Sequence, residues 1–253
     1  MSYVIYEKKD HIVIITLNRP DRLNALGTEM MQQFAEAETK FAEDDDAWVA
    51  VYTGAGDRAF SAGRDLKEAA SAPSPTGSPM PTRRRGFAQH DKPTIAAING
   101  LAYGGGTELA LNCDVRICSE NATFALAEVK VGLVPPTGSF NLPRLVGLSN
   151  AMWLLMGGEP IDANEALRIG LVTKIVPQSE LLSTATNMAG IICQNAPMAV
   201  RAAKQLAKWG MEVPLDYAQR LGAGLIRTVW TSEDAVEGAK AFVEKRKPVW
   251  KMR

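Results

Sequence analysis

Three consecutive glycines, Gly104, Gly105 and Gly106, and a nearby glutamate, Glu108, form the stretch of the chain best suited to chemistry. β-Branched residues precede the glycines and helix-forming residues follow them, which predicts a strand, a glycine turn and the start of a helix. Such a turn leaves backbone N–H groups without partners at the positive end of the helix dipole, where glycine lets a ligand approach closely. The stretch predicts a site for an anion or a developing oxyanion, although a tight turn or a close helix crossing would also require glycine.

The glycine run matches neither of the common nucleotide-binding motifs. The dinucleotide fingerprint would need a glycine at Leu109, and the chain has no Gly-Lys-Ser/Thr of a phosphate-binding loop. Glu108 lies in the first turn of the predicted helix, directly before Leu109, Ala110 and Leu111. A carboxylate there is either stabilised by the helix dipole alone or, as its apolar neighbours indicate, buried in the wall of a site. The second possibility makes Glu108 a candidate for catalysis.

A second turn of small residues lies at residues 59–66, Ala-Phe-Ser-Ala-Gly-Arg-Asp-Leu, again ahead of a predicted helix. It can supply a second N–H group without a partner, and two such donors make an oxyanion hole. Farther along, Glu128 precedes a turn that contains Pro135 and Pro136, and it is the second carboxylate of interest. Taken alone, Glu128 could equally cap a helix or form a salt bridge.

A serine hydrolase is the rival interpretation of the second turn. Residues 59–63 are one residue away from the Gly-x-Ser-x-Gly nucleophile elbow, and Ser61 could complete a triad with His90 and Asp91. However, Ala59 stands where the motif needs glycine, and Ser61 does not follow its strand directly. The sequence therefore favours an oxyanion hole over a nucleophile.

The first two thirds of the chain carry the signals of an α/β protein. Short β-branched runs predict strands at residues 11–17, 48–53, 94–98 and 114–118, with one more at 171–176. Thr28 predicts the N-cap of a helix whose apolar residues recur at helical spacing, and Asp162 with Glu165 resembles a capping box.

From residue 179 onward the pattern is helical only. Pro197 suits the first turn of a helix, Ser232 can cap the next, and the last helix is expected to contain Phe242, Val243, Lys245 and Arg246. We expect this helical tail to pack on the core or on another subunit.

Composition limits the classes of partner. The chain has 253 residues, is 46% hydrophobic and carries no net charge, so it can form one large domain and lacks a basic footprint for nucleic acid or membranes. Three cysteines and two histidines without a cluster argue against a metal site and for reduced thiols. With no membrane span or signal-peptide layout, a cytoplasmic protein is expected. Residues 69–85, rich in proline and serine, are expected to form a loop.

Three motifs together resemble the enoyl-CoA hydratase/isomerase family, the crotonases. They are Ala-Gly-Arg-Asp-Leu at 62–66, Asn-Gly through Gly-Gly-Gly-Thr-Glu-Leu-Ala at 99–110, and the segment from Phe124 through Glu128 and Gly132 to Pro135. The resemblance covers nearly the whole chain. It implies an α/β fold, a spiral of ββα repeats over residues 1–195, with a C-terminal helical trimerisation region at 196–253 and a homotrimer or homohexamer.

The resemblance also implies roles for particular residues. It assigns the oxyanion-hole N–H groups to Arg64 and Gly105 and the reacting water to Glu108 and Glu128. The coenzyme A part of the substrate would contact Phe242 and Lys245 of a neighbouring subunit, and in the same chain Arg22, Leu23, Ala25, Ala62, Gly63, Asp65 and Leu66. No separate cofactor and no metal are implied.

The resemblance predicts an enoyl-CoA hydratase that adds or removes water across the C2–C3 bond, in fatty acid metabolism. The tail, at residues 232–238 and 244–250, is similar to that of carnitinyl-CoA dehydratases, so such an activity and enoyl-CoA isomerisation are the alternatives. A coenzyme-A-binding or assembly protein on the same fold is a further one. Ala127, the segment 136–139 and the bulky Arg64 depart from the usual pattern, which bears on the acyl group more than on the reaction.

Overall fold

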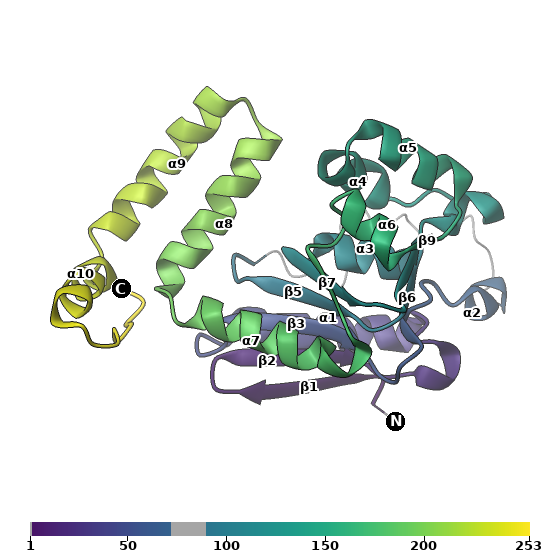
Figure 1. The fold of residues 1–253 in the computed structure, drawn as a ribbon, viewed down its shortest axis with the longest axis horizontal. Coiled ribbons are helices and arrows are strands. Elements are labelled where there is room, and N and C mark those ends of the chain that lie inside the picture. Colours follow the sequence, from purple (N-terminus) through teal and green to yellow (C-terminus); the bar gives the residue numbers. More distant parts are fainter. Residues whose placement is uncertain (1, 72–89) are drawn as a thin grey trace.

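The computed structural model describes residues 2–71 and 90–253. Within these residues, one sheet has six strands in the order β1-β2-β3-β5-β7-β10, and a second has four in the order β4-β6-β8-β9 (Figure 1). The larger sheet consists of β1 (Val4–Lys9), β2 (Ile12–Leu17), β3 (Val49–Gly54), β5 (Thr94–Ile98), β7 (Val115–Ser119) and β10 (Lys174–Val176). The smaller consists of β4 (Ala59–Ser61), β6 (Leu101–Tyr103), β8 (Thr123–Ala125) and β9 (Ile161–Asp162).

The central strands β3 and β5 of the larger sheet are buried at every position, as their parallel pairing favours. Val49 and Val51 of β3 belong to an apolar cluster with α7 (Leu181–Cys193), which packs against β2, β3, β5 and β7. The intervening Ala50 and Tyr52 face the main core, which includes the buried side of α1 (Thr28–Glu43). Because successive side chains of β3 point to opposite faces of the sheet, this one strand contributes to two apolar cores.

The two sheets are linked by a repeated ββα turn. Each of β3, β5 and β7 continues into a strand of the smaller sheet and then into a helix: β4 into α2 (Leu66–Ser71), β6 into α3 (Gly105–Asn112), and β8 into the 3-10 helix η2 (Ala127–Val131). Because β4, β6 and β8 are parallel neighbours, the three helix starts lie next to one another. The expected spiral is confirmed, and it brings together turns that are far apart in the sequence.

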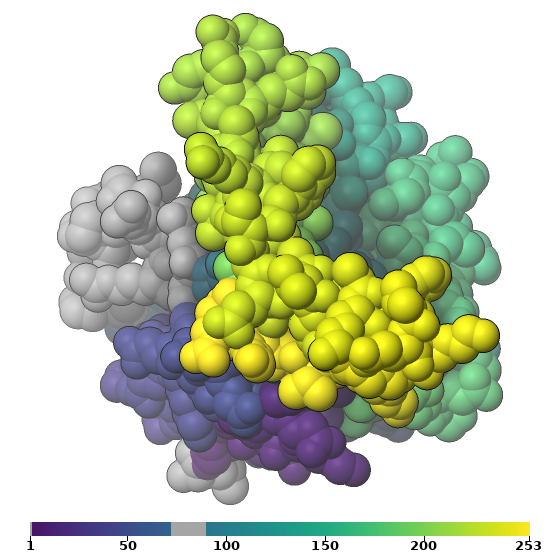
Figure 2. Space-filling model, turned by 90° about the vertical axis from the view of Figure 1, so that its left-hand side faces the viewer, coloured from purple at the N-terminus to yellow at the C-terminus, as the bar shows by residue number. Residues whose placement is uncertain are grey.

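The remaining helices cover the spiral and extend beyond it. After η2 come α4 (Gly138–Val146), α5 (Leu148–Gly157) and α6 (Ala163–Arg168). Figure 1 shows α8 (Pro197–Glu212) and α9 (Leu215–Trp230) side by side, projecting away from the sheets, with α10 (Glu233–Glu244) at the C-terminal end of α9. Figure 2 views this side, where α9 and α10 form an outer layer. In the part of the chain described, no helix is long and apolar enough to cross a membrane.

Buried ionic contacts attach α8 to the spiral. The Lys204 ammonium donates to the Lys92 carbonyl at 2.6 Å and pairs with Asp114 at 2.7 Å, and only 11% of its side chain is exposed. Asp114 also accepts the N–H and the hydroxyl of Thr94 at the start of β5. The direction of α8 is therefore set by a charge pair on the sheet rather than by apolar packing alone.

Several local predictions are confirmed. The Asp162 carboxylate accepts the Glu165 N–H at 2.8 Å, the Ser232 hydroxyl accepts the Ala235 N–H at 3.1 Å, and Pro197 begins α8. The glycine turn does precede a helix, with the short strand β6 inserted between β5 and the turn.

Two boundary predictions are wrong. Gly27, not Thr28, is the N-cap of α1, and the Thr28 N–H is capped instead by the Glu68 carboxylate of α2 at 2.9 Å. At the other end, α10 stops at Glu244, because Lys245 adopts a left-handed conformation with φ 52°. Of the expected loop at 69–85, its first three residues are the end of α2, and the rest lies outside the described residues.

Candidate active site

The first two ββα turns bring two peptide nitrogens close together. Gly63 follows β4 with φ 80°, and a Cβ placed on it would lie 2.4 Å from the Tyr103 carbonyl and 2.9 Å from the nitrogen of Gly105. A Cβ on Gly105 would lie 3.7 Å from the nitrogen of Arg64. Glycine is required at position 63 both by its positive φ and by this approach of two backbones.

The N–H groups of Arg64 and Gly105 donate no hydrogen bond to any residue in the part of the chain that the structure describes. Their neighbours are occupied: Ala62 donates to the Leu23 carbonyl, Asp65 to that of Leu26, and Gly104 to that of Ala125. The Gly105 N–H also lies at the positive end of α3. Two adjacent donors without acceptors have the geometry of an oxyanion hole.

Glu108 is held by a second helix start. Its Oε1 accepts the N–H of Thr137 at 2.6 Å and of Gly138 at 2.8 Å, at the N-terminus of α4. Glu108 is only 6% exposed. The carboxylate therefore interacts with the dipoles of both α3 and α4, and the pair of N–H donors fixes the direction of its plane.

Glu128 has a different environment. It lies in η2, and its Oε2 is buried without a hydrogen-bond partner. Burial raises the pKa of the Glu128 carboxyl above its ordinary value of 4.5, and the negative charge of Glu108 raises this pKa further. Neither an ion pair nor a cap that would use this side chain is found among the described residues, so the two structural roles left open for Glu128 are not realised there.

Glu128 lies beside the glycine turn. A Cβ on Gly104 would be 3.2 Å from the Glu128 Oε1, and Gly104 directly precedes the N–H of Gly105. Through its effect on the pKa of Glu128, Glu108 is also an electrostatic neighbour. The structure thus brings Arg64, Gly105, Glu108 and Glu128 from three turns of the spiral into one region.

The residues expected to contact coenzyme A have mixed positions. Arg22 and Leu66 are exposed, Ala62 and Leu23 are partly buried, and Ala25 and Gly63 are buried within the loops that border the Arg64 turn. Leu23 has φ 51°, and its carbonyl accepts the Ala62 N–H. These residues therefore form one rim next to Arg64.

Asp65 has a local structural task. Its Oδ1 accepts the N–H groups of Lys67 and Glu68, and its Oδ2 binds Arg19 at 2.9 Å. The hydrogen bond from the Glu68 backbone is the largest cause of the lowered pKa of Asp65, followed among the lowering effects by the bond from Arg19. Its carboxylate is thus occupied in shaping the turn.

Phe242 and Lys245 lie far from this region of their own chain. Figure 1 shows α10 at the left edge of the molecule, separated from α3 by α8 and the larger sheet. The Phe242 side chain is 86% exposed. Neither residue reaches the site of the chain to which it belongs, so any role there requires a second subunit.

Three positioning residues were missed by the sequence analysis. The Asn24 amide donates to the carbonyls of Ala55 and Ala59, and the Asn99 amide to those of Gly54, Gly56 and Ala59. The Thr107 hydroxyl lies 2.5 Å from the Ala102 carbonyl and 2.9 Å from that of Ala125, which fixes α3 to β6 and β8. A short polar residue beside each glycine turn is the signal that could have identified them.

The serine hydrolase interpretation finds no support in the geometry. Ser61 is fully buried, and its hydroxyl donates to the Asn24 carbonyl at 2.8 Å. His90 instead faces Glu38, 3.8 Å away, and the ring of Phe41. Because burial lowers the pKa of His90 to about 4, this contact is not an ion pair at neutral pH.

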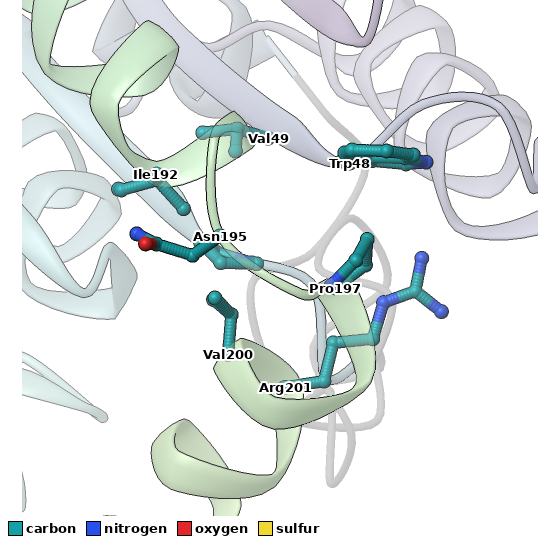
Figure 3. A pocket seen from close by; sticks show the side chains of 8 residues that line it. Trp48, Val49, Ile192, Asn195, Pro197, Val200 and Arg201 are labelled. Atoms are coloured by element: carbon teal, nitrogen blue, oxygen red, sulfur yellow. The ribbon is translucent and has the colours of Figure 1, made fainter. Parts of the chain in front are cut away.

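A small pocket lies elsewhere (Figure 3). It is lined by Trp48 and Val49 at the start of β3, by Pro93 before β5, by Ile192 of α7 and Asn195 after it, and by Pro197, Val200 and Arg201 of α8. These are the amino ends of the parallel strands, whereas the Arg64 and Gly105 turns follow the carboxyl ends. The described residues also contain no group of His, Cys, Asp or Glu side chains that could hold a metal.

A spiral of ββα turns in two sheets, with donor N–H groups and carboxyl side chains converging at the turns, is the architecture expected of crotonases. The profile of the enoyl-CoA hydratase/isomerase family matches residues 7–253. The chain is 42% identical over 250 residues to carnitinyl-CoA dehydratases of Salmonella paratyphi A and Salmonella typhi, covering 96% of this chain and 95% of each relative.

Solved structures agree with this match. An enoyl-CoA hydratase from Bacillus anthracis superposes with a TM-score of 0.93 at 35% identity, over 100% of both chains. One from Mycobacterium tuberculosis gives a TM-score of 0.93 at 35% identity, over 99% of both. The chain belongs to the enoyl-CoA hydratase/isomerase family.

Proposed function

We propose that this protein is a hydro-lyase that adds water to, or removes it from, the C2–C3 bond of an acyl-CoA thioester. The observation that carries the proposal is the convergence of two N–H donors, on Arg64 and Gly105, that have no acceptor among the described residues, with two carboxyl groups in different environments. Addition of water to an enoyl thioester needs both parts, because negative charge develops on the carbonyl oxygen while protons are moved at C3 and C2.

In this proposal the thioester carbonyl oxygen accepts hydrogen bonds from Arg64 and Gly105. The donors are preorganised, since the two turns are packed against each other before substrate arrives. Each such donor typically contributes about 3 kcal/mol to the stabilisation of the transition state.

The two glutamates divide the proton transfers. Glu108, oriented by the N–H groups of α4, accepts the proton of the water that attacks C3. Glu128, whose pKa is raised, is the better proton reservoir and supplies the proton to C2. Elimination of water runs through the same groups in the opposite order.

Carnitinyl-CoA dehydration is the second candidate within this class. It is supported by the 42% identity to carnitinyl-CoA dehydratases over nearly the full chain. Isomerisation alone would move a proton without water and would leave one of the two glutamates without a task.

We further propose that the helices of residues 196–253 form a region, distinct from the spiral of residues 1–195, that assembles a trimer. Large apolar side chains are exposed along it, among them Leu215, Trp230, Phe242 and Val243, which are 66%, 79%, 86% and 79% exposed. In such an assembly Phe242 and Lys245 would reach the coenzyme site of a neighbour. A monomer in sedimentation equilibrium would refute this part.

A thioester assay tests the function. The purified protein is incubated with 2-enoyl-CoA thioesters and with carnitinyl-CoA, and the formation or loss of the conjugated enoyl thioester is followed by its ultraviolet absorbance. We expect turnover of at least one substrate and its loss in Glu128→Gln. Tight binding of coenzyme A thioesters without turnover of any of them would indicate a binding protein instead.

A further inference from the structure

Arg64 brings a charged side chain to the turn that supplies one donor of the proposed oxyanion hole. Its backbone N–H is one of the two donors, while its side chain is exposed. The guanidinium makes no ion pair, hydrogen bond or ring contact with any residue between 2 and 71 or between 90 and 253. A cationic side chain that has no partner among the described residues requires a physical account.

The neighbouring carboxylates are already occupied. Asp65 binds Arg19 and caps α2, and Glu68 accepts the Thr28 N–H. Neither forms an ion pair with Arg64 within the described part of the chain. The turn therefore presents a positive charge that no side chain in residues 2–71 and 90–253 neutralises through an ion pair.

A thioester bound through the Arg64 N–H carries its acyl chain within a side chain's length of this charge. An acyl group that ends in a quaternary ammonium would be repelled, and one that ends in a carboxylate would be attracted. The relatives named carnitinyl-CoA dehydratases act, by that name, on an acyl group derived from carnitine, which is a quaternary ammonium compound.

We propose that the side chain of Arg64 selects the charge of the acyl group, in the order anionic, then neutral, then cationic. This inference rests on the proposed function, because it concerns the substrate of that site. For two unit charges about 8 Å apart, Coulomb's law with an effective dielectric constant between 80 and 20 gives a discrimination of roughly 2- to 30-fold.

The test uses a pair of thioesters that differ only in charge. One is 4-trimethylammonio-but-2-enoyl-CoA, and the other is its carbon isostere, in which a tert-butyl group replaces the trimethylammonium. The ratio of kcat/KM for the cationic over the neutral thioester is measured for the wild type, Arg64→Gln, Arg64→Lys and Lys67→Gln. A substitution that disturbs the backbone donor at residue 64 affects both thioesters equally, so this effect cancels in the ratio. The two thioesters also differ in intrinsic reactivity, but that difference is the same for every variant and cancels when the ratios of two variants are compared.

We expect the ratio to rise roughly 2- to 30-fold in Arg64→Gln, to stay at the wild-type value in Arg64→Lys, and to change less in Lys67→Gln. The saturated analogues of the two thioesters, which cannot react, serve as competitive inhibitors. In Arg64→Gln the inhibition constant of the cationic analogue should fall relative to that of the neutral one, which tests the inference even if turnover is slow. Turnover with a ratio that Arg64→Gln leaves unchanged would overturn the role of Arg64 alone. Absence of turnover with either thioester, and with pent-2-enedioyl-CoA, would overturn the proposed function and this inference with it.

Discussion

The substitution Gly63→Ala tests whether the close approach of two turns creates the oxyanion hole. A methyl group at this position would lie 2.4 Å from the Tyr103 carbonyl and 2.9 Å from the nitrogen of Gly105, whereas ordinary contacts begin at 3.4 Å. Alanine must therefore push the Gly105 turn away from Arg64. Because both contacts are to backbone atoms, no side-chain rotation can relieve them.

Two effects combine in this variant. The left-handed φ of 80° costs an alanine about 1–2 kcal/mol of folding free energy. Displacement of one oxyanion donor is expected to lower kcat about 10²- to 10³-fold. Gly170→Ala separates the two effects, because Gly170 has φ 79° but no atom within 4 Å of its added Cβ.

The assay measures kcat, KM and the thermal midpoint Tm for both variants with one 2-enoyl-CoA. The strained φ should lower the Tm of both variants by a similar amount, and the backbone contacts should lower the Tm of Gly63→Ala further. Only Gly63→Ala should have a lowered kcat. If Gly63→Ala is folded and turns over as fast as Gly170→Ala, the two peptide nitrogens do not form the catalytic donor pair.

Three further predictions concern the glutamate pair, the α3 anchor and His90. Glu128→Gln should lower kcat at least ~10²-fold. The wild type should lose hydration activity as pH rises through the raised pKa of Glu128 and the variant should not, so the same pH profile in both would exclude Glu128 as the acid. Thr107→Val should cost about 1–2 kcal/mol in denaturant unfolding and lower kcat more than it raises KM, whereas unchanged kcat would make its role purely structural. His90 has a pKa of about 4 against 6.5 when unfolded, so the unfolded state binds more protons between these values and stability falls as pH drops from 6.5 to 4. His90→Asn should remove up to about 3 kcal/mol of that decline, and equal pH slopes in urea titrations would contradict it.

The local chemistry of the chain was sufficient to predict many of its elements. The strand at Thr94–Ile98, the proline at the start of α8 and the caps at Asp162 and Ser232 follow from residue types within one turn of the backbone. The prediction of Thr28 as a cap failed because its N–H finds an acceptor in Glu68, 40 residues away. A contact at that separation cannot be predicted from the residues next to Thr28.

The identity of the candidate site residues was likewise visible in the sequence, because glycine turns and isolated carboxylates among apolar residues are unusual in one chain. Their environments were not. Glu108 receives two N–H groups from α4, 29 and 30 residues later in the chain. The sequence could not say that the pKa of Glu128 is raised, because that depends on burial and on the charge of Glu108.

By itself the sequence determined the class of fold, the positions of the two donor turns and the presence of two glutamates, since these depend on residue type and short-range backbone preference. Only the tertiary structure decided that the turns meet at Gly63 and Gly105, that Asn24, Asn99 and Thr107 hold them there, and that Asp65 is engaged by Arg19. The physical reason is that these contacts join residues between 18 and 46 positions apart in the sequence, and the turns become neighbours only when β4, β6 and β8 pair in parallel.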